Sequence, residues 1–382
     1  MNTAVGIFLL IYGAVILFYL AIAWYNSLGY ESIGSAVTDK DTGARVTVII
    51  PARNEINNIK SCLCSLVKQK YNNYSILVVD GDSTDGTRDF LEAFSTNNKQ
   101  VSWVAEEPLP DGWVGKSFAC WQGAQQADGE WLYFVDADTE HAPTMISATQ
   151  QYIRHHNLDF LSLMTGQKMS GFWENVILPN VFLWFGTRFP IRKVNDPQSS
   201  EARATGQFIA IRKDVYNATS GHHAIRDKVV EDFAFAGLVK DAGYKIRVAG
   251  GNQLVTTRMY RTFAQIWEGF SKNIFFAGGQ SLFGTVQACL YIFLTQIFPF
   301  VVPLYLVWNR QAGLALTILA LFPAVLAIIV RVQLNILLKL RHIYIITIPL
   351  GGIITCGIHL NSARMYFSGK GMKWKGRIYA KH

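Results

Sequence analysis

The sequence predicts an α/β domain built on a mostly parallel sheet and flanked by membrane-spanning helices. Half of the 382 residues are hydrophobic and only 16% are charged, whereas roughly 25% are charged in ordinary soluble domains. The missing charges are concentrated in a few long stretches, which is typical of membrane spans. Residues 46–251 have mixed polarity instead and alternate strand-like with helix-like segments, a pattern typical of a parallel sheet covered by helices.

The first charge-free stretch occupies the start of the chain. No charged residue occurs in residues 1–30, and the apolar run at 6–24 is long enough to cross a bilayer. A secretory signal peptide has a basic leading region, which is absent here, although residues 21–23 offer a weak cleavage-like site. We therefore interpret residues 1–30 as an uncleaved transmembrane anchor.

Three further charge-free stretches of spanning length lie near the C-terminus. They run between Lys272 and Arg310, between Arg310 and Arg331, and between His342 and Arg364. The expected division of the chain is an anchor at 1–30, the α/β domain at 31–255, an amphipathic interface helix at 256–280, a transmembrane region at 281–363 and a basic tail at 364–382.

Basic residues determine the expected orientation. None precedes the first span, whereas Lys40, Arg45 and Arg53 follow it, and cytoplasmic flanks retain Lys and Arg. This predicts a multi-pass protein of the cell membrane with the α/β domain in the cytoplasm. Flanks that meet anionic lipid head groups then explain the net charge of +8 without a nucleic-acid partner.

The C-terminal tail conflicts with this orientation. Three crossings after the α/β domain would export residues 364–382, which carry six Lys or Arg and no acid. The conflict disappears if one apolar segment does not cross. We expect residues 343–359 to be that segment, because Pro349 and the glycines at 351–352 can turn a hairpin back within the membrane.

Two carboxylates mark the first candidate site. Asp136 and Asp138 directly follow residues 131–135, which have the pattern of a buried strand. Mg²⁺ and Mn²⁺ prefer oxygen ligands and bridge to phosphates, so this placement suits such a cation held against a diphosphate. A solvated turn is the alternative interpretation of this short motif.

Two more polar clusters follow predicted strands. Residues 51–55 come after the strand at 46–50, and residues 80–87 come after the strand at 75–79. Ligands of parallel sheets bind beyond the carboxyl ends of the strands, so we expect these clusters to meet in one crevice suited to a nucleotide. Residues 80–87 are also good helix caps, and residues 51–55 can form a plain turn.

The motifs in this order and spacing resemble those of the family 2 glycosyltransferases, which have the GT-A fold of nucleotide-diphospho-sugar transferases. The residues that carry this resemblance are 48–55, 80–87, 136–138 and Glu231–Asp232. Further segments resemble, more narrowly, the bacterial lipid-directed branch that contains carotenoid-acid and hopanoid-associated glycosyltransferases. They are residues 111–117, 258–261 with 267–269, and 374–379.

The resemblance implies a role for each motif. Asp232 would be the general base of an inverting reaction, with Glu231 next in line, and the alternative is that both residues cap a helix. Asp136 and Asp138 would hold Mg²⁺ or Mn²⁺. The residues expected to bind the nucleotide-sugar are Pro51, Ala52, Arg53, Glu55, Asp80, Asp82, Lys116, Asp136, Arg258 and Arg261.

The chain departs from the family pattern in two places. The usual turn contains Asp-Asp-Gly-Ser, whereas residues 80–83 are Asp-Gly-Asp-Ser, which leaves open whether Asp80 or Asp82 faces the base. The Gln-x-x-Arg-Trp motif of processive polysaccharide synthases is absent, and residues 258–261 stand near its place. This absence favours an enzyme that makes a single transfer.

The acceptor can be narrowed by acid–base chemistry. An alcohol is a poor nucleophile at neutral pH and needs a carboxylate, Asp232, to take its proton. A carboxylic acid with a pKa near ~4 is already ionised and needs no base. Asp232 therefore favours a hydroxyl acceptor.

Two aromatic segments suggest how an apolar acceptor is approached. Residues 172–185 suit either the membrane interface or a core helix of the α/β domain, and residues 260–276 have the pattern of an amphipathic interface helix. The pair at 222–223 is interpreted as a polar loop rather than as a metal site, because no third ligand has suitable spacing.

We therefore expect a metal-dependent hexosyltransferase that moves a sugar from a UDP-sugar to a lipid acceptor in the membrane. The acceptor would be a carotenoid, hopanoid, sphingolipid or another hydroxylated or carboxylated lipid. The alternative enzymes are a polyprenyl-phosphate sugar transferase and a polysaccharide synthase. The alternative from another class is a non-catalytic membrane protein that binds nucleotide-sugars.

Overall fold

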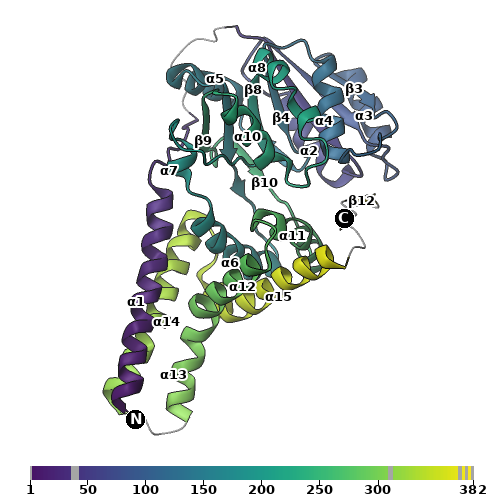
Figure 1. Cartoon of the computed structure of the whole chain (residues 1–382). Helices are drawn as coiled ribbons and strands as arrows, with labels where there is room; N and C mark the ends of the chain where they lie inside the picture. Colours follow the sequence, from purple (N-terminus) through teal and green to yellow (C-terminus); the bar gives the residue numbers. More distant parts are fainter. Residues whose placement is uncertain (1, 36–42, 309–312, 369–371, 375–376, 380–382) are drawn as a thin grey trace. The chain divides into compact units, whose positions relative to one another are not determined.

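The computed structural model describes residues 2–35, 43–308, 313–368, 372–374 and 377–379. It divides the chain into two compact units, which are described separately (Figure 1). Unit 1 contains Met1–Leu28, Met169–Pro190 and Tyr260–His382, and unit 2 contains Gly29–Lys168 and Ile191–Met259.

Unit 2 is built on a seven-stranded sheet with the order β3-β2-β1-β4-β8-β6-β9. Strand β8 runs antiparallel to its neighbours β4 and β6, and the other described pairs in this sheet are parallel. The sheet is therefore mostly parallel, as predicted. The strands are β1 (Val46–Ala52), β2 (Tyr74–Asp80), β3 (Val101–Ala105), β4 (Trp131–Val135), β6 (Phe160–Met164), β8 (Phe208–Arg212) and β9 (Ile246–Gly250).

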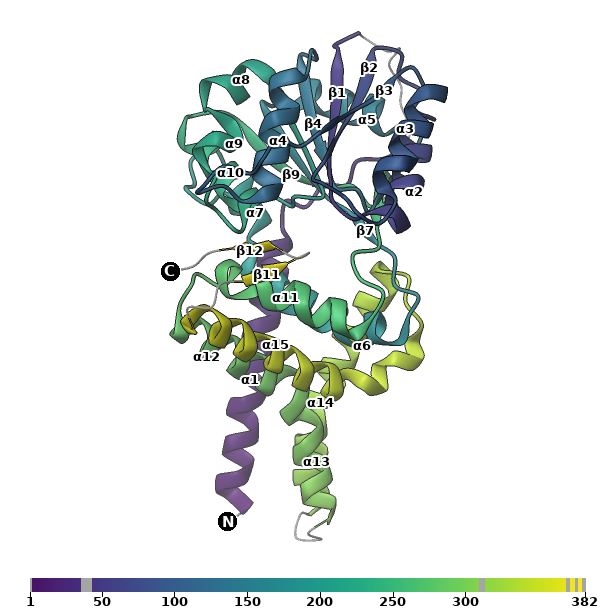
Figure 2. The same ribbon diagram turned by 90° about the vertical axis from the view of Figure 1, so that its right-hand side faces the viewer.

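Helices cover both faces of this sheet (Figure 2). Strand residues are buried on both faces, which explains their continuous apolar runs. On one face, Val48 and Tyr133 pack in a core shared with α2 (Ile56–Leu66) and α5 (Met145–His156). On the other face, α4 (Gly115–Gln126) brings Gly123 against Ile49, and α10 (Glu231–Asp241) brings Phe235 against Phe134.

Smaller elements complete unit 2. A second sheet has the order β5-β10-β7, and its strand β5 begins immediately after Asp138. The remaining elements are α3 (Thr87–Asn97), β5 (Thr139–His141), β7 (Gly166–Gln167), α7 (Ile191–Val194), α8 (Lys213–Ala218), α9 (Gly221–Ala224) and β10 (Val255–Thr257).

Unit 1 is helical and contains four helical segments that are long and apolar enough to cross a membrane, within the described residues: Thr3–Asn26, Leu282–Trp308, Ala315–Leu337 and His342–Phe367. They correspond to the four charge-free stretches of the sequence. The elements are α1 (Asn2–Ser27), α6 (Phe172–Arg188), α11 (Phe263–Ala277), α12 (Leu282–Ile292), the π-helix η1 (Phe293–Ile297), α13 (Phe298–Trp308), α14 (Leu314–Leu337), the 3₁₀-helix η2 (His342–Thr347), α15 (Ile348–Phe367), β11 (Met372–Trp374) and β12 (Arg377–Tyr379).

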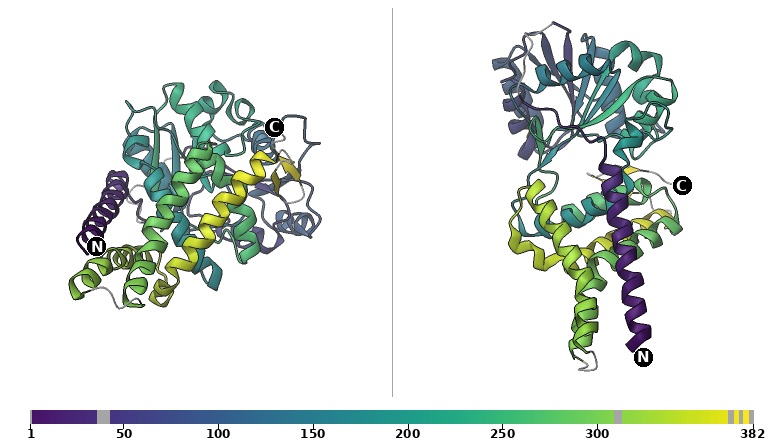
Figure 3. Two further views of the ribbon diagram at one scale, coloured as in Figure 1. Left: turned by 60° about the horizontal axis from the view of Figure 1, so that its bottom comes forward. Right: turned by 90° about the vertical axis from the view of Figure 1, so that its left-hand side faces the viewer.

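The segment expected to form a membrane hairpin has a different structure. Pro349 lies in the first turn of α15, which continues without a break to Phe367, because proline is tolerated where the helix N–H groups have no intrahelical partner. The hairpin prediction is therefore wrong. Helix α15 nevertheless runs across the direction shared by α1, α13 and α14 within unit 1 (Figures 2 and 3).

Helix α6 also differs from expectation. Residues 169–190 were predicted to belong to the α/β domain, whereas the structure groups them with unit 1. The helix continues through Pro179, and Asn180 and Trp184 are buried with it. Of the two interpretations of residues 172–185, the core helix of the α/β domain is wrong.

Candidate active site

The polar clusters that follow β1 and β2 contact each other directly. Gly81 N donates to Ala52 O at 2.7 Å, Asn54 N donates to Ser83 Oγ at 2.9 Å, and the Arg53 guanidinium donates to Gly81 O. These bonds join loops that are far apart in sequence. The structure thus confirms that residues 51–55 and 80–87 form one surface at the carboxyl edge of the sheet.

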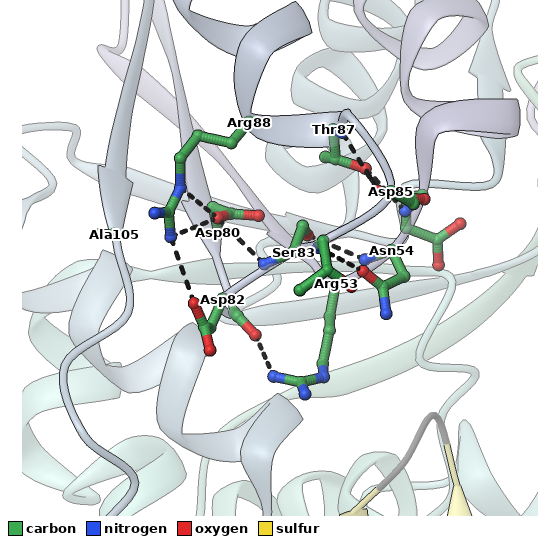
Figure 4. A network of polar contacts seen from close by, with 12 residues as sticks. Arg53, Asn54, Asp80, Asp82, Ser83, Asp85, Thr87, Arg88 and Ala105 are labelled. Atoms are coloured by element: carbon green, nitrogen blue, oxygen red, sulfur yellow. Dashed lines mark hydrogen bonds and ion pairs between the residues drawn. The ribbon is translucent and has the colours of Figure 1, made fainter.

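Asp80 is the centre of a buried network in this surface (Figure 4). Its Oδ2 accepts hydrogen bonds from Arg88 Nε at 3.2 Å and Ser83 N at 3.3 Å, and Arg88 Nη2 lies 3.1 Å away. Asp80 Oδ1 is buried and has no hydrogen-bond partner among the described residues. Asp82, by contrast, has a side chain that is 77% exposed and lies 3.6 Å from Arg88 Nη2, so Asp80 is the buried acceptor of the two.

A second cluster brings together four distant segments. Lys116 Nζ, in the first turn of α4, lies 2.7 Å from Asp136 Oδ1 and 2.9 Å from Glu231 Oε1. Asp232 is the residue after Glu231, and its Oδ2 accepts a hydrogen bond from Gly206 N at 2.9 Å. We call Lys116, Asp136, Glu231 and Asp232 the acidic cluster.

Glu231 and Asp232 do not cap α10. The N-cap position is Val230, and the two carboxylates occupy the first turn of the helix. Asp232 Oδ1 accepts from Phe233 N at 2.9 Å while Oδ2 accepts from Gly206 N. Both residues therefore lie where the helix N-terminus favours negative charge, and their side chains form part of the acidic cluster.

Burial and charge pairing shift the pKa values of this cluster. Burial raises the pKa of Asp232 to about 7, and the charge of Glu231 adds to the rise while Lys116 and the Gly206 N–H oppose it. Burial also raises the pKa of Asp136, with Lys116 acting in the opposite direction. Burial acts to lower the pKa of Lys116, but Asp136 and Glu231 outweigh it and raise that pKa well above its usual value.

A buried network holds the turn that carries Asp136. Thr139 Oγ1 donates to Asp136 O at 2.6 Å and lies 3.3 Å from His141 Nε2, and Ser65 Oγ of α2 lies 3.3 Å from His141 Nδ1. Burial lowers the pKa of His141 to about 3. His141 is therefore a neutral hydrogen-bonding residue that positions the turn.

The carboxylates of Asp136 and Asp138 fit a divalent cation that is held mainly by the phosphates of a bound substrate. Among the described residues, no group of three or more His, Cys, Asp or Glu is gathered to hold a metal ion. Asp136 and Asp138 supply hard oxygen donors, and Mg²⁺ is commonly held by one or two carboxylates together with substrate phosphates. The donor set thus fits a cation that binds with a diphosphate.

Three other candidates have different environments. Arg258 follows β10 in unit 2, whereas Arg261 lies in unit 1, where its N–H donates to Gln265 Oε1 at 2.8 Å. His222 is buried against Phe134 and lies 3.1 Å from Tyr216 Oη. His222 therefore belongs to an aromatic core, and its assignment to a polar loop is wrong.

Two residues of the site, Gly206 and Arg88, were not predicted from the sequence. A Cβ on Gly206 would lie 3.0 Å from Lys116 Nζ and 3.4 Å from Asp232 Oδ2, so the cluster closes around a residue without a side chain. No local pattern marks that glycine. Arg88 carries a signal in retrospect, because a cation in the first turn of a helix is unfavourable unless a carboxylate such as Asp80 compensates.

Comparison with known proteins finds a family that part of the chain resembles. Residues 47–219 match the family model described as Glycosyl transferase family 2. These residues are thus similar to family 2 glycosyltransferases. Unit 2 contains the matched range except residues 169–190, which belong to unit 1.

Curated relatives agree with this family. The 4,4'-diaponeurosporenoate glycosyltransferase of Staphylococcus haemolyticus (strain JCSC1435) is 26% identical over 238 residues, which cover 61% of this chain and 62% of that protein. The protein of the same name from Staphylococcus aureus (strain USA300) is 28% identical over 237 residues, which cover 60% of each chain. The match thus spans about three fifths of the length of these relatives.

A solved structure shows the same fold. The mannosyltransferase PcManGT from Pyrobaculum calidifontis, solved in complex with GDP-Man and Mn²⁺, is 17% identical and aligns with a TM-score of 0.51 over 92% of this chain and 99% of that chain. At this identity the similarity concerns the fold. The α/β domain therefore has the GT-A fold predicted from its motifs.

Proposed function

We propose that this protein is a membrane-bound, metal-dependent hexosyltransferase that moves a sugar from a UDP-sugar to a lipid acceptor with inversion. The acidic cluster is the observation that carries the proposal, because it places a cation, a candidate metal ligand and a candidate base within one group of contacts. The similarity to family 2 glycosyltransferases and the relatives named for a carotenoid acid support a glycosyl transfer to a lipid.

The Asp80 network supports recognition of the nucleotide base. Asp80 is fixed by Arg88 and Ser83, and its buried Oδ1 remains available as an acceptor. A uracil ring has an N–H group that can donate a hydrogen bond to such an oxygen. An unpaired buried carboxylate oxygen is costly, so a ligand donor at this point stabilises the bound state.

The acidic cluster supports the departure of the nucleoside diphosphate. Mg²⁺ or Mn²⁺, bound to Asp136 and Asp138, would neutralise negative charge on the leaving phosphates. Lys116 keeps its positive charge at neutral pH, since its pKa is raised well above the usual value. The ammonium group can therefore turn from the carboxylates toward the diphosphate and stabilise the charge that develops there.

Asp232 is assigned to the acceptor. Its carboxylate is held by two backbone N–H groups, and a hydroxyl within hydrogen-bond reach would give up its proton to it during attack. Attack from the face opposite the leaving group inverts the anomeric centre. A carboxylate acceptor is the second candidate, favoured by the name of the curated relatives, and it would need no base.

Unit 1 supports attachment to a membrane. Its four candidate spans are long and apolar enough to cross, and large side chains such as Phe283, Leu304 and Ile346 are exposed on them. We infer a multi-pass protein of the cell membrane with the α/β domain in the cytoplasm, from the basic residues that follow the first span.

A release assay tests the proposal. The full-length protein in lipid nanodiscs is incubated with UDP-glucose, Mn²⁺ and mixed bacterial lipids, and released UDP and glycosylated lipid are measured. Asp136→Ala combined with Asp138→Ala is expected to lower transfer at least about a hundredfold, as loss of a charge-stabilising group does. Glu92→Ala, on the exposed surface of α3, is the matched control. Unchanged transfer by the double variant would refute the assignment.

A further inference from the structure

Two of the five cysteines of the chain meet in unit 1. Cys289 lies in α12 and Cys356 lies in α15, and both are half-buried free thiols. The other three cysteines lie in unit 2, where Cys62 and Cys120 are buried and Cys64 is half-buried. Neither cysteine of unit 1 belongs to the acidic cluster, so the proposed sugar transfer does not explain why they meet.

The side chains of Cys289 and Cys356 point toward each other. Cys289 Sγ lies 3.9 Å from Cys356 O, and Cys356 Sγ lies 3.7 Å from Cys289 O. The two thiol groups also contact each other. Two cysteines can be bridged only where their backbones are close and their side chains do not point apart. The reciprocal contacts show that this pair meets both conditions.

Neighbouring residues hold the two helices close together. A Cβ on Gly352 would lie 3.1 Å from Gln296 Cβ and 3.1 Å from Ile297 Cγ1. Gln296 and Ile297 belong to η1, which continues α12. Gly352 precedes Cys356 by four residues and therefore lies on the same face of α15. Because the backbones on this face are already in close contact, a bond between the two sulfurs needs rotation of side chains and little movement of the helices.

An apolar reagent can reach this pair. The side chains of Leu290, Ile353 and Leu360, which lie near the two cysteines in sequence, are exposed on the apolar surface of unit 1. Both α12 and α15 belong to segments that are long and apolar enough to cross a membrane. The half-buried sulfurs of Cys289 and Cys356 are therefore open to a reagent that dissolves in lipid, whereas the buried thiols of unit 2 are protected.

We propose that Cys289 and Cys356 form a reversible disulfide that joins α12 to α15 in the presence of an oxidising disulfide. The reaction is thiol–disulfide exchange. The thiolate of one cysteine attacks the oxidant, forms a mixed disulfide and releases one thiol. The thiolate of the other cysteine then attacks the mixed disulfide and releases the second thiol. The two cysteines lose two protons and two electrons, which reduce one oxidant disulfide to two thiols.

The bond would close a loop formed by residues 289–356, which contains α13, α14 and η2. A cross-link over a long loop restricts the unfolded chain and so stabilises the folded state. Disulfides on the cytoplasmic side of a cell are usually transient and redox-sensing, so the bond would form during oxidation and be reduced afterwards. It depends on the two cysteines alone and would form even in a protein with no transferase activity.

The test uses the full-length protein in lipid nanodiscs at about pH 8, where ordinary thiols are partly ionised. Dipyridyl disulfide, an apolar disulfide, is added in small excess. The remaining thiols are then blocked with N-ethylmaleimide, and unreduced peptides are mapped by mass spectrometry. Cys289→Ala and Cys356→Ala each remove one partner. Cys64→Ala is the matched control, because it removes the half-buried thiol of unit 2.

We expect wild type and Cys64→Ala to give a cross-linked peptide pair that contains residues 289 and 356. The thermal midpoint should rise by at least about 2 °C on oxidation, and dithiothreitol should reverse both changes. In Cys289→Ala and Cys356→Ala the remaining cysteine should keep a pyridylthio group instead. Wild type in which Cys289 and Cys356 stay unreacted, or in which each carries its own pyridylthio group without a cross-link, would overturn the proposal.

Discussion

At the scale of single residues, Asp232 couples burial to chemistry. Its carboxylate lies in the first turn of α10, next to Glu231, and accepts hydrogen bonds from Gly206 and Phe233. Burial penalises the charged form and raises the pKa to about 7, and the hydrogen bonds limit the rise. A base with a pKa near the working pH has enough ionised form and enough basicity to accept a proton.

This pKa predicts how transfer to a hydroxyl acceptor depends on pH. Asp232 must be ionised to act, so kcat/KM should rise with pH through about 7 and fall roughly tenfold for each pH unit below that value. The profile is measured by UDP release, with UDP binding followed at each pH as a control for the donor site. Asp232→Asn should remove most of the activity and the rising limb together. A flat wild-type profile across this range would contradict the assignment of the base.

The sequence predicted which residues belong to the site better than it predicted their contacts with one another. Lys116, Asp136 and Glu231 were expected to bind phosphate, metal or proton, and the structure brings them into contact. The close approach of Gly206 was not predictable, because a glycine before a strand has no signature of the side chains that will surround it. The choice between Asp80 and Asp82 also required the structure, since burial distinguishes two carboxylates that look alike in sequence.

At the scale of elements, several strands of the mostly parallel sheet were predicted, whereas the antiparallel strand β8 was not. The strands at 46–50, 75–79 and 131–135 were all expected, because β-branched and aromatic runs are typical of strands buried on both faces. Strand β8 has the same kind of run but is antiparallel to β4. An apolar run carries no information on direction. Short elements such as α9 and β7 are below the length at which periodicity is visible.

The close contact between α15 and α6 in unit 1 depends on Gly351. Gly351 of α15 approaches α6 so closely that a Cβ would overlap the Asn180 amide and Val176 O. We expect Gly351→Ala to destabilise the protein by about 1–3 kcal/mol, as overpacking does, and to lower the thermal midpoint in detergent. Gly186→Ala, on α6 with no atom within 4 Å of its Cβ position, is the matched control. Equal midpoints for the two variants would contradict the expected destabilisation.

At the scale of the whole molecule, the basic tail and the direction of α15 point to the same topology. Residues 364–382 carry six Lys or Arg and no acid, which predicts a cytoplasmic tail. Within unit 1, α15 runs across α1, α13 and α14 (Figure 3). We therefore propose that α15 lies along a membrane that the other three helices cross. Residues 343–359 would then not cross, as predicted from the sequence, although they form helices and not a hairpin.

This topology predicts where reporters fused to the chain will be active. With α1, α13 and α14 crossing, green fluorescent protein fused after His382 should fluoresce in a bacterial host, and alkaline phosphatase inserted between α13 and α14 should be active outside the cytoplasm. Green fluorescent protein fused before α12 should fluoresce like the full-length fusion. This control tests whether the α/β domain lies in the cytoplasm. If α15 crossed as a fourth span, the C-terminal fusion would be dark and phosphatase at that end would be active. Because the tail carries no acid, positive charge opposes that outcome and favours retention of the tail in the cytoplasm.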